Sequence, residues 1–306
     1  MTDEQPNCEP LDECYRELTD ESPALDVAVG TLIERLGSLR AATPRTEWRT
    51  FGDDARCRHP ICEILREDPF TLRAIEKPRG YAGDAKMIDF VYGHAATNHI
   101  SEIGKAILAS TTNTSTAQSV RHRRDAFARA VDDTASETEL PRILALACGH
   151  LREAHLAKAV REKRIGEYVA FDQDAKSLAV VEHEFSKFGV RTVQGSVLDL
   201  EFADLGKFDL IYAAGLYDYL CRGAAKELTA YAFEMLNPRG RLMIANVLPD
   251  IPDAGYMEAM MDWWLIYRTA EQLESVADSI PANEIATKRT FNDPLDNIVF
   301  LEVGRE

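Results

Sequence analysis

The residues best placed for chemistry stand where apolar runs end in the second half of the chain. The run "RILALAC" (142–148) stops at Gly149 and His150, and a helix is expected to follow. A glycine at such a turn lets the backbone approach a ligand, and the free N–H groups at the start of a helix bind anionic groups. We predict that Cys148 and Gly149 contact a cofactor, and that His150 orients a substrate or acts as a base near neutral pH.

An acid ends the next apolar run. Asp172 closes "EYVAFD" (167–172) and follows Gly149 by 23 residues. An acid at about that distance can accept hydrogen bonds from both hydroxyls of a ribose. The alternative role is that of a helix N-cap for "QDAKSL", for which Asp174 competes.

Two further signals belong to later strands. Ser196 and Val197 stand at the end of "RTVQGS" (191–196) and could flank a purine, with Asp199 reaching its amino group; a plain turn explains the same letters. The segment "LNPRGRL" (236–242) combines a helix end, a turn that contains proline and the start of a strand. The order and spacing of all four signals predict a nucleoside site at the carboxyl ends of successive strands.

These residues need a parallel sheet to bring them together, and the pattern after Pro141 predicts one. Short apolar runs alternate with amphipathic helical segments, which is typical of a doubly wound α/β fold. The expected strands are 142–148, 167–172, 191–196, 208–215, 241–247, 284–291 and 297–304. The expected helices are 151–163, 176–188, 224–236 and 269–280.

The first part of the chain has a different periodicity. Apolar residues recur at helical spacing from Leu25 onward, interrupted by prolines and glycines that predict short helices. Residues 1–20 are acidic and are expected to form a loosely held tail. The predicted organisation is this tail, a helical N-terminal domain over 21–138 and a ligand-binding domain over 139–306.

Composition narrows the class of protein. The chain has 306 residues, 45% of them hydrophobic, and a net charge of −16, which argues against nucleic acid as the main partner. The basic cluster "RHRRDAFAR" (121–129) is interpreted as the solvated face of a helix. No apolar run is long enough to span a membrane, and the acidic N-terminus is unlike a signal peptide. We expect a soluble cytoplasmic protein that acts on a small molecule.

The six cysteines show neither a CxxC pair nor the spacing of zinc ligands. Reduced structural thiols are therefore expected, and no metal site is predicted. The sequence makes no prediction of the oligomeric state.

Over residues 141–306 these features resemble the class I methyltransferases that use S-adenosylmethionine (SAM). In that family the loop after the first strand holds the methionine part of SAM, the acid after the second strand holds the ribose, and the loop after the third holds the adenine. The resemblance implies these roles for Gly149, Asp172, Ser196 and Val197. It also implies a Rossmann-like sheet of seven strands in the order 3-2-1-4-5-7-6.

Two departures from related patterns matter. "LNPRGRL" matches the family's "L-x-P-G-G-x-L" except at Arg239, and Arg152 follows the first loop, where it could reach the methionine carboxylate. A dehydrogenase would need the second and third glycines of G-x-G-x-x-G to bring pyrophosphate to the backbone. In this chain larger residues stand at the positions of those two glycines, so pyrophosphate could not lie close to the backbone. SAM, which has no phosphate, therefore fits better than NAD.

The N-terminal half narrows the resemblance. "EDPFTLRAIEKPRGYAGDA" and "DFVYG" resemble the helical lid of a bacterial group of SAM enzymes, over roughly residues 57–306. One kind of member methylates the carboxyl of a 3-hydroxy fatty acid to make a signalling ester. The other forms azetidine-2-carboxylate from SAM itself, when the SAM amino group attacks Cγ and methylthioadenosine leaves.

Aromatic residues suit either chemistry, because they hold a sulfonium without offering a competing nucleophile. Tyr81 lies in a glycine-rich turn and Tyr217 just beyond a strand, and we predict catalytic positions for both, although core packing is the common role of any one tyrosine. Tyr92 in "DFVYG" and Arg79 in "PRGY" are expected to bind substrate. Arg79 could fork onto a carboxylate or pair with Asp84.

The hypothesis is a SAM-dependent methyltransferase that acts on a small molecule, with a carboxylate as one acceptor class, in secondary metabolism or signalling. The alternative is a SAM cyclase that forms azetidine-2-carboxylate and methylthioadenosine. The bulk of Leu151 would narrow the site and favour cyclisation, whereas packing is an equal explanation of that residue. A third hypothesis, a SAM-binding module without catalysis, leaves the aromatic lid without a reason.

Overall fold

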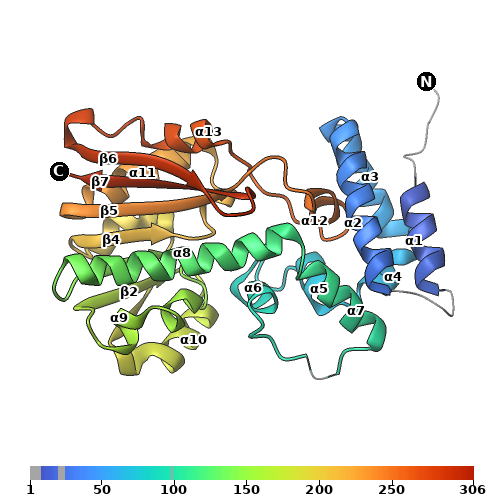
Figure 1. Ribbon diagram of the computed structural model, residues 1–306, viewed down its shortest axis with the longest axis horizontal. Coiled ribbons are helices and arrows are strands. Elements are labelled where there is room, and N and C mark those ends of the chain that lie inside the picture. Colours follow the sequence, from blue (N-terminus) through green and yellow to red (C-terminus); the bar gives the residue numbers. More distant parts are fainter. Residues whose placement is uncertain (1–7, 20–24, 98) are drawn as a thin grey trace. The chain divides into compact units, whose positions relative to one another are not determined.

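A computed structural model describes residues 8–19, 25–97 and 99–306 (Figure 1). The chain divides into two compact units, each built from two segments. The first unit comprises Met1–Gln118 and Asp250–Trp264, and the second comprises Ser119–Pro249 and Leu265–Glu306. No helix in the described part of the chain combines the length and apolarity needed to cross a bilayer.

The second unit contains one seven-stranded sheet in the predicted order, β3-β2-β1-β4-β5-β7-β6. The order confirms the fold that the sequence predicts. Its strands are β1 (Arg142–Leu146), β2 (Glu167–Asp172), β3 (Val190–Gln194), β4 (Phe208–Ala213), β5 (Leu236–Val247), β6 (Ile285–Asn292) and β7 (Ile298–Arg305).

Strands β1 to β5 pair in parallel, and β7 pairs antiparallel with both β5 and β6. The chain order reverses between β1 and β4, which are neighbours in the sheet. In an open α/β sheet, ligands bind at the carboxyl ends of the strands on either side of such a switch point. The topology therefore predicts that a ligand binds at the loops after β1 and β4, together with the neighbouring loop after β2.

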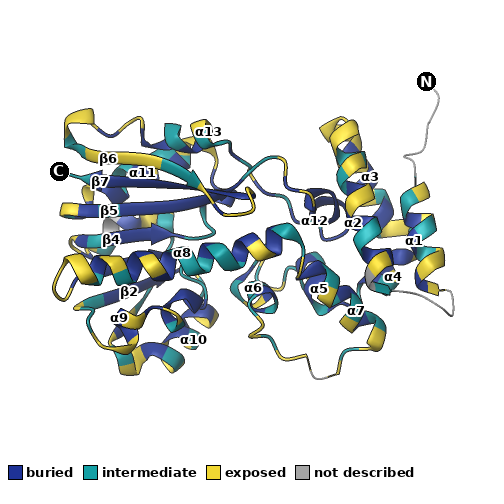
Figure 2. Ribbon diagram, viewed as in Figure 1, coloured by how far each residue is buried: buried dark blue, intermediate teal, exposed yellow. Residues whose placement is uncertain are grey.

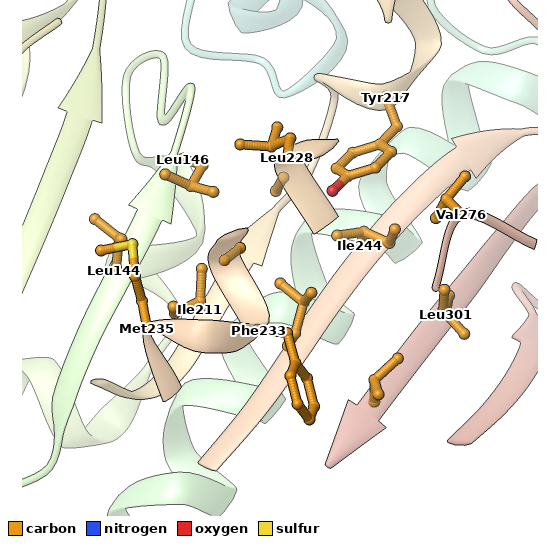
Figure 3. Packing of buried hydrophobic residues seen from close by; sticks show 14 of the residues in the cluster. Leu144, Leu146, Ile211, Tyr217, Leu228, Phe233, Met235, Ile244, Val276 and Leu301 are labelled. Carbon is orange, nitrogen blue, oxygen red and sulfur yellow. The ribbon is translucent and has the colours of Figure 1, made fainter. Parts of the chain in front are cut away.

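Alternate residues of the inner strands face two different helical layers. Leu144 and Leu146 of β1 belong to a hydrophobic cluster with Leu228 and Phe233 of α11 (Arg222–Glu234), shown in Figure 3. On the opposite face, Phe127 of α8 (Ser115–Glu137) stacks on Tyr212 of β4 at 5.0 Å. The inner strands are thus covered on both faces, as a parallel sheet requires.

Burial falls off at one edge of the sheet. In Figure 2, β7 is buried along most of its length, whereas β6 is largely exposed. Lys288 and Arg289 lie on this edge strand, and charged side chains there discourage pairing with another chain.

The segment after β1 differs from the single helix predicted for 151–163. It forms a 3₁₀ turn, η1 (Arg152–His155), and a short helix, α9 (Lys158–Arg161). The carboxylate of Asp132 in α8 accepts from the backbone N–H groups of Lys158 and Ala159 at 3.1 and 2.7 Å. A cap supplied by another element starts a new helix at that point, and local periodicity does not reveal it.

Strand β5 begins five residues before the predicted start at 241. Leu236 pairs with Phe208, and the register then shifts so that Arg241 pairs with Leu210. Arg239, which stands where the related motif has glycine, has φ +68. The expected turn is therefore an irregularity within the strand.

The other helices of the second unit follow the predictions more closely. Helix α10 (Ala175–Phe185) is extended by the 3₁₀ turn η2 (Ser186–Phe188), and the segment predicted at 269–280 forms α13 (Ala270–Glu274) and η5 (Ser275–Ala277). Three further 3₁₀ turns complete the unit: η3 (Val197–Ala203), η4 (Tyr217–Tyr219) and η6 (Ala282–Glu284).

The first unit is helical in its described part. Its helices are α1 (Glu9–Thr19), α2 (Leu25–Ala42), α3 (Arg45–Arg58), α4 (Ile61–Leu65), α5 (Pro69–Glu76), α6 (Ala85–Val91), α7 (Glu102–Thr111) and α12 (Ala254–Ala259). Within the expected acidic tail, α1 buries Leu11, Cys14 and Leu18, whose spacing places them on one helix face. The rest of that tail lies outside the described residues.

Helix α12 comes from the C-terminal half of the chain, yet it is buried among the N-terminal helices. Its Glu258 accepts two hydrogen bonds from Arg40, from Nε at 2.7 Å and from Nη2 at 3.0 Å, and a third from Trp48 Nε1 at 2.9 Å. A buried carboxylate with this set of donors is compensated for its desolvation. Segment 250–264 is therefore an integral part of the helical unit, which linear periodicity does not indicate.

Close backbone contact holds α12 against α2. A Cβ on Gly255 would lie 2.3 Å from the carbonyl of Leu36, and one on Gly37 would lie 2.5 Å from the carbonyl oxygen of Pro252. Only glycine permits this approach, because the neighbouring atoms are backbone and cannot rotate away.

We predict that Gly255→Ala lowers the free energy of unfolding by about 1–3 kcal/mol, because the added methyl overpacks the α12–α2 contact. Gly30→Ala in α2 is the matched control, since nothing lies within 4 Å of its added Cβ. That variant should gain about 0.5–1 kcal/mol from helix propensity. Chemical denaturation followed by circular dichroism measures both, and equal stability of the two variants would show that the contact is looser than described.

Candidate active site

The loop after β1 is held in an unusual conformation. Ala147, Gly149 and Leu151 have φ values of +49, +54 and +51. A backbone with such positive φ values costs a residue that has a side chain about 1–2 kcal/mol. Leu151 N–H closes the turn by donating to the carbonyl of Cys148 at 2.9 Å. The larger residues that replace the usual glycines thus keep a glycine-like backbone at a cost in strain.

Asp172 joins this loop to two others. Its Oδ2 accepts from Gly149 N–H at 2.8 Å, and its Oδ1 accepts from Asp174 N–H at 2.8 Å. Its backbone carbonyl accepts from Gly195 N–H, after β3, at 3.0 Å. Asp174, not Asp172, caps α10, accepting from Lys176 N–H at 3.0 Å. Asp174 is therefore the N-cap of α10, and Asp172 connects the loops after β1, β2 and β3.

The loop after β3 packs tightly on β2. A Cβ on Gly195 would lie 2.6 Å from the ring of Phe171, so a larger residue would push this loop away from Asp172. Ser196 Oγ accepts from Leu198 N–H at 3.2 Å and starts η3. Val197 is half-buried, whereas Asp199 is exposed. Ser196 and Val197 thus directly follow Gly195, whose N–H group donates to Asp172, and their adenine contact stays a prediction.

A second buried network lies after β4. Asp218 in η4 accepts through Oδ1 from Val247 N–H at 2.7 Å, and its carbonyl accepts from Ile266 N–H at 2.7 Å. Arg268 donates through Nη1 to the carbonyl of Tyr217 at 2.6 Å and to Asn246 Oδ1 at 2.7 Å. These bonds fix the loop that forms the second wall of the switch point. Its members lie far apart in the sequence, so no local pattern predicts the network.

Tyr217 occupies a core position. It is fully buried in the hydrophobic cluster of Figure 3, and its hydroxyl shares a hydrogen bond of 2.8 Å with Thr229 of α11. Burial raises the pKa of this phenol well above its ordinary value. The contacts explain Tyr217 as a packing residue and give no support to a catalytic role.

Beneath the loop after β1 lies a chain of three buried polar groups. Tyr212 donates to Glu153 Oε1 at 2.5 Å, and the hydroxyls of Tyr212 and Tyr168 lie 2.5 Å apart. Burial raises the pKa of Glu153, although the hydrogen bond from Tyr212 opposes the rise. Glu153 thus anchors the loop to β2 and β4.

Cys148 is part-exposed in the same loop. Desolvation raises the pKa of its thiol well above the ordinary value, and the negative charges of Asp172 and Glu153 raise it further. The group therefore stays a thiol at neutral pH and is a poor nucleophile.

The two basic residues predicted around the loop are buried. Arg152 donates to Glu184 of α10 at 2.6 Å, an interaction that also involves His155. Burial raises the pKa of Glu184, but the hydrogen bonds from Arg152 and His155 outweigh it and leave the pKa below its ordinary value. This pairing explains Arg152 structurally. His150 is buried beside Gly149.

One arginine was misinterpreted from the sequence. Arg123 belongs to the basic cluster expected on a solvated helix face, yet it is 6% exposed. It stands four residues before Phe127 and eight before Val131, both fully buried on α8. That helical spacing was the signal that could have placed Arg123 on the inner face.

Arg79 and Tyr81, two of the predicted residues of the first unit, lie in the turn between α5 and α6. Arg79 Nε is 4.0 Å from Asp84 Oδ2, while Arg73 donates from Nε to the other oxygen of Asp84 at 2.8 Å. Tyr81 and Tyr92 are half-buried, and Tyr92 forms the C-cap of α6. Of the two roles offered for Arg79, this ion pair agrees with pairing to Asp84.

Comparison with known families finds a match for part of the second unit. Residues 143–240 match the model of a methyltransferase domain, and the sheet has the strand order of the class I methyltransferases. The second unit therefore has the fold of the class I methyltransferases. SAM is the cofactor of such a domain, and the matched segment contains the loop after β1, Asp172 and the loop after β3.

Solved structures share the fold at low sequence identity. A candidate exported protein from Bordetella parapertussis aligns with a TM-score of 0.61 and 13% identity, over 87% of this chain and 98% of that chain. A candidate methyltransferase from Thermobifida fusca aligns with a TM-score of 0.56 and 16% identity, over 72% of this chain and 94% of that chain. Comparison with curated proteins gives no significant match.

The buried state of Glu153 predicts a pH dependence of stability. Since its pKa is raised above the ordinary 4.5, the folded protein keeps a proton that the unfolded chain releases, and stability falls as pH rises between the two values. Glu153→Gln keeps an acceptor for Tyr212 but does not titrate. We predict that its free energy of unfolding, relative to the native protein, increases above pH 4.5 by up to about 1.4 kcal/mol per pH unit.

Denaturation of both proteins across pH 4.5–8 measures the effect. Tyr212→Phe is the companion variant, because it removes the hydrogen bond that lowers the pKa of Glu153 and should extend the dependence to higher pH. Stability curves of Glu153→Gln and the native protein that run parallel would contradict the prediction.

Proposed function

We propose that this chain transfers the methyl group of SAM to a small-molecule acceptor, with a carboxylate as the acceptor class. The observation that carries the proposal is the centre at Asp172, which joins the loops after β1, β2 and β3 within the matched methyltransferase segment. The small-molecule acceptor is supported by the net charge of −16, which disfavours a polyanionic partner.

The residues fit SAM. Each carboxylate oxygen of Asp172 accepts a hydrogen bond from a backbone N–H group, and an acid at the end of the second strand is the group that would accept the two ribose hydroxyls. The close approach of Gly195 to Phe171 leaves the loop after β3 flat against β2, where Ser196 and Val197 would flank the adenine. Gly149 and the part-exposed backbone around it would hold the amino-acid end.

When bound, SAM supplies an electrophilic carbon on a positively charged sulfur. The protein's task is then to orient groups and exclude competing nucleophiles. Cys148 meets the second demand, because its raised pKa keeps it protonated. His150 remains our candidate for orienting the acceptor or accepting its proton. Tyr81, Tyr92 and Arg79 remain proposed substrate contacts from the helical lid.

SAM cyclisation is the alternative reaction. The bulk of Leu151 would favour cyclisation if its side chain narrowed the site. Leu151 is fully buried, so its side chain packs in the interior and gives no reason to prefer cyclisation. Methyl transfer is therefore the reaction we propose. The two reactions can be told apart by their products.

Incubation of the pure protein with SAM alone separates these reactions. We predict unchanged SAM over hours, followed by S-adenosylhomocysteine and a methyl ester when a 3-hydroxy fatty acid is added. Mass spectrometry identifies the products. Methylthioadenosine together with azetidine-2-carboxylate, formed without an acceptor, would replace our proposal by the cyclase. Heat-treated protein controls for the spontaneous breakdown of SAM.

A further inference from the structure

Three arginines are buried in the second unit, and their hydrogen bonds differ. Arg152 donates to Glu184, and Arg268 donates to the carbonyls of Tyr217 and Leu220 and to Asn246. The Nε of Arg123 is buried and has no hydrogen-bond partner among the described residues. A buried donor left unpaired is costly, so native proteins rarely leave one without a partner.

Arg123 lies at the switch point of the sheet. Its Nη2 is 3.4 Å from the position that a Cβ on Gly215 would take, just after β4. Its Nη1 is 3.7 Å from Asp218 Oδ2, which is an ion pair but is beyond hydrogen-bond distance. Its charge also lowers the pKa of Glu153, after β1, against the effect of burial. Arg123 is therefore close to both walls of the predicted ligand crevice.

Two buried acids interact with Arg123, and the other two buried arginines have acceptors of their own. Glu153 and Asp218 are both buried acids; burial raises the pKa of each, and the charge of Arg123 opposes that rise. Arg268 donates to three oxygen acceptors, and Arg152 donates to Glu184. Of the three buried arginines, Arg123 is the one with a buried nitrogen that has no hydrogen-bond partner among the described residues.

We propose that Arg123 binds a ligand carboxylate at the switch point between β1 and β4. This inference rests on the proposed function, which brings two ligands with such a group: SAM, through its amino-acid end, and a carboxylate acceptor. The planar guanidinium offers Nε and an Nη as a fork that matches the two oxygens of a carboxylate. Gly215 leaves the space beside the guanidinium free of a side chain.

The test removes the guanidinium and the carboxylate in turn. Isothermal titration measures the binding of S-adenosylhomocysteine and of S-adenosyl-3-thiopropylamine, the same molecule without its carboxylate, to the native protein and to Arg123→Gln. A third titration adds 3-hydroxydecanoate to protein saturated with S-adenosylhomocysteine. Arg129→Gln, an exposed arginine on the same helix, is the matched control and should bind like the native protein.

If the cofactor supplies the carboxylate, Arg123→Gln binds S-adenosylhomocysteine about tenfold or more weakly, while its affinity for the decarboxylated analogue changes less than twofold. If the acceptor supplies it, the loss appears only in the titration with 3-hydroxydecanoate. Arg123→Lys, which keeps the charge without the fork, should restore part of the lost affinity.

Equal losses for both adenosyl ligands would overturn the proposal in favour of a structural role. Unchanged affinity for all three ligands would overturn it as well. Arg123→Gln could unfold because Asp218 loses its counter-charge, so Arg123→Gln/Asp218→Asn, which removes both charges, is titrated in parallel. A native protein that binds no adenosyl ligand would refute the proposed function itself, an outcome distinct from these.

Discussion

The hydrogen bonds of Asp172 are the constraint on which the candidate site depends. One residue at the end of β2 fixes the loop after β1 through Gly149, the start of α10 through Asp174 and the loop after β3 through Gly195. The loop after β1 contains three residues with positive φ and would not hold that shape alone. Its attachment to Asp172, and to β4 through Glu153, offsets the strain.

The site combines two kinds of buried polar group with different consequences. Glu153, Tyr212 and Tyr168 satisfy one another, so they anchor the loop without inviting a ligand. Arg123 is not satisfied in this way, because its Nε has no partner among the described residues. Buried groups of the first kind stabilise a fold, whereas one of the second kind lacks a partner, and for Arg123 we propose a ligand carboxylate as that partner.

The sheet could be predicted from the sequence because its strands are apolar runs of the right length, bounded by turn residues. The centre at Asp172 was also predictable, since Gly149 and Asp172 have the spacing that a strand, a helix and a strand impose. What escaped prediction depends on distant partners. Asp132 interrupts the segment after β1, and the Arg40–Glu258 pair binds α12 to the N-terminal helices. Arg123 was missed because a cluster of charges concealed its place on the buried face.

Binding of SAM to Asp172→Ala is the most direct test of this account. Removing the carboxylate releases Gly149 and the proposed ribose contacts together, so we predict that SAM binds at least tenfold more weakly in isothermal titration. Asp174→Ala is the control, because it removes only the cap of α10, costs about 1 kcal/mol of stability and should leave SAM affinity intact. Unaltered affinity of a folded Asp172→Ala would contradict the central claim that Asp172 organises the cofactor site.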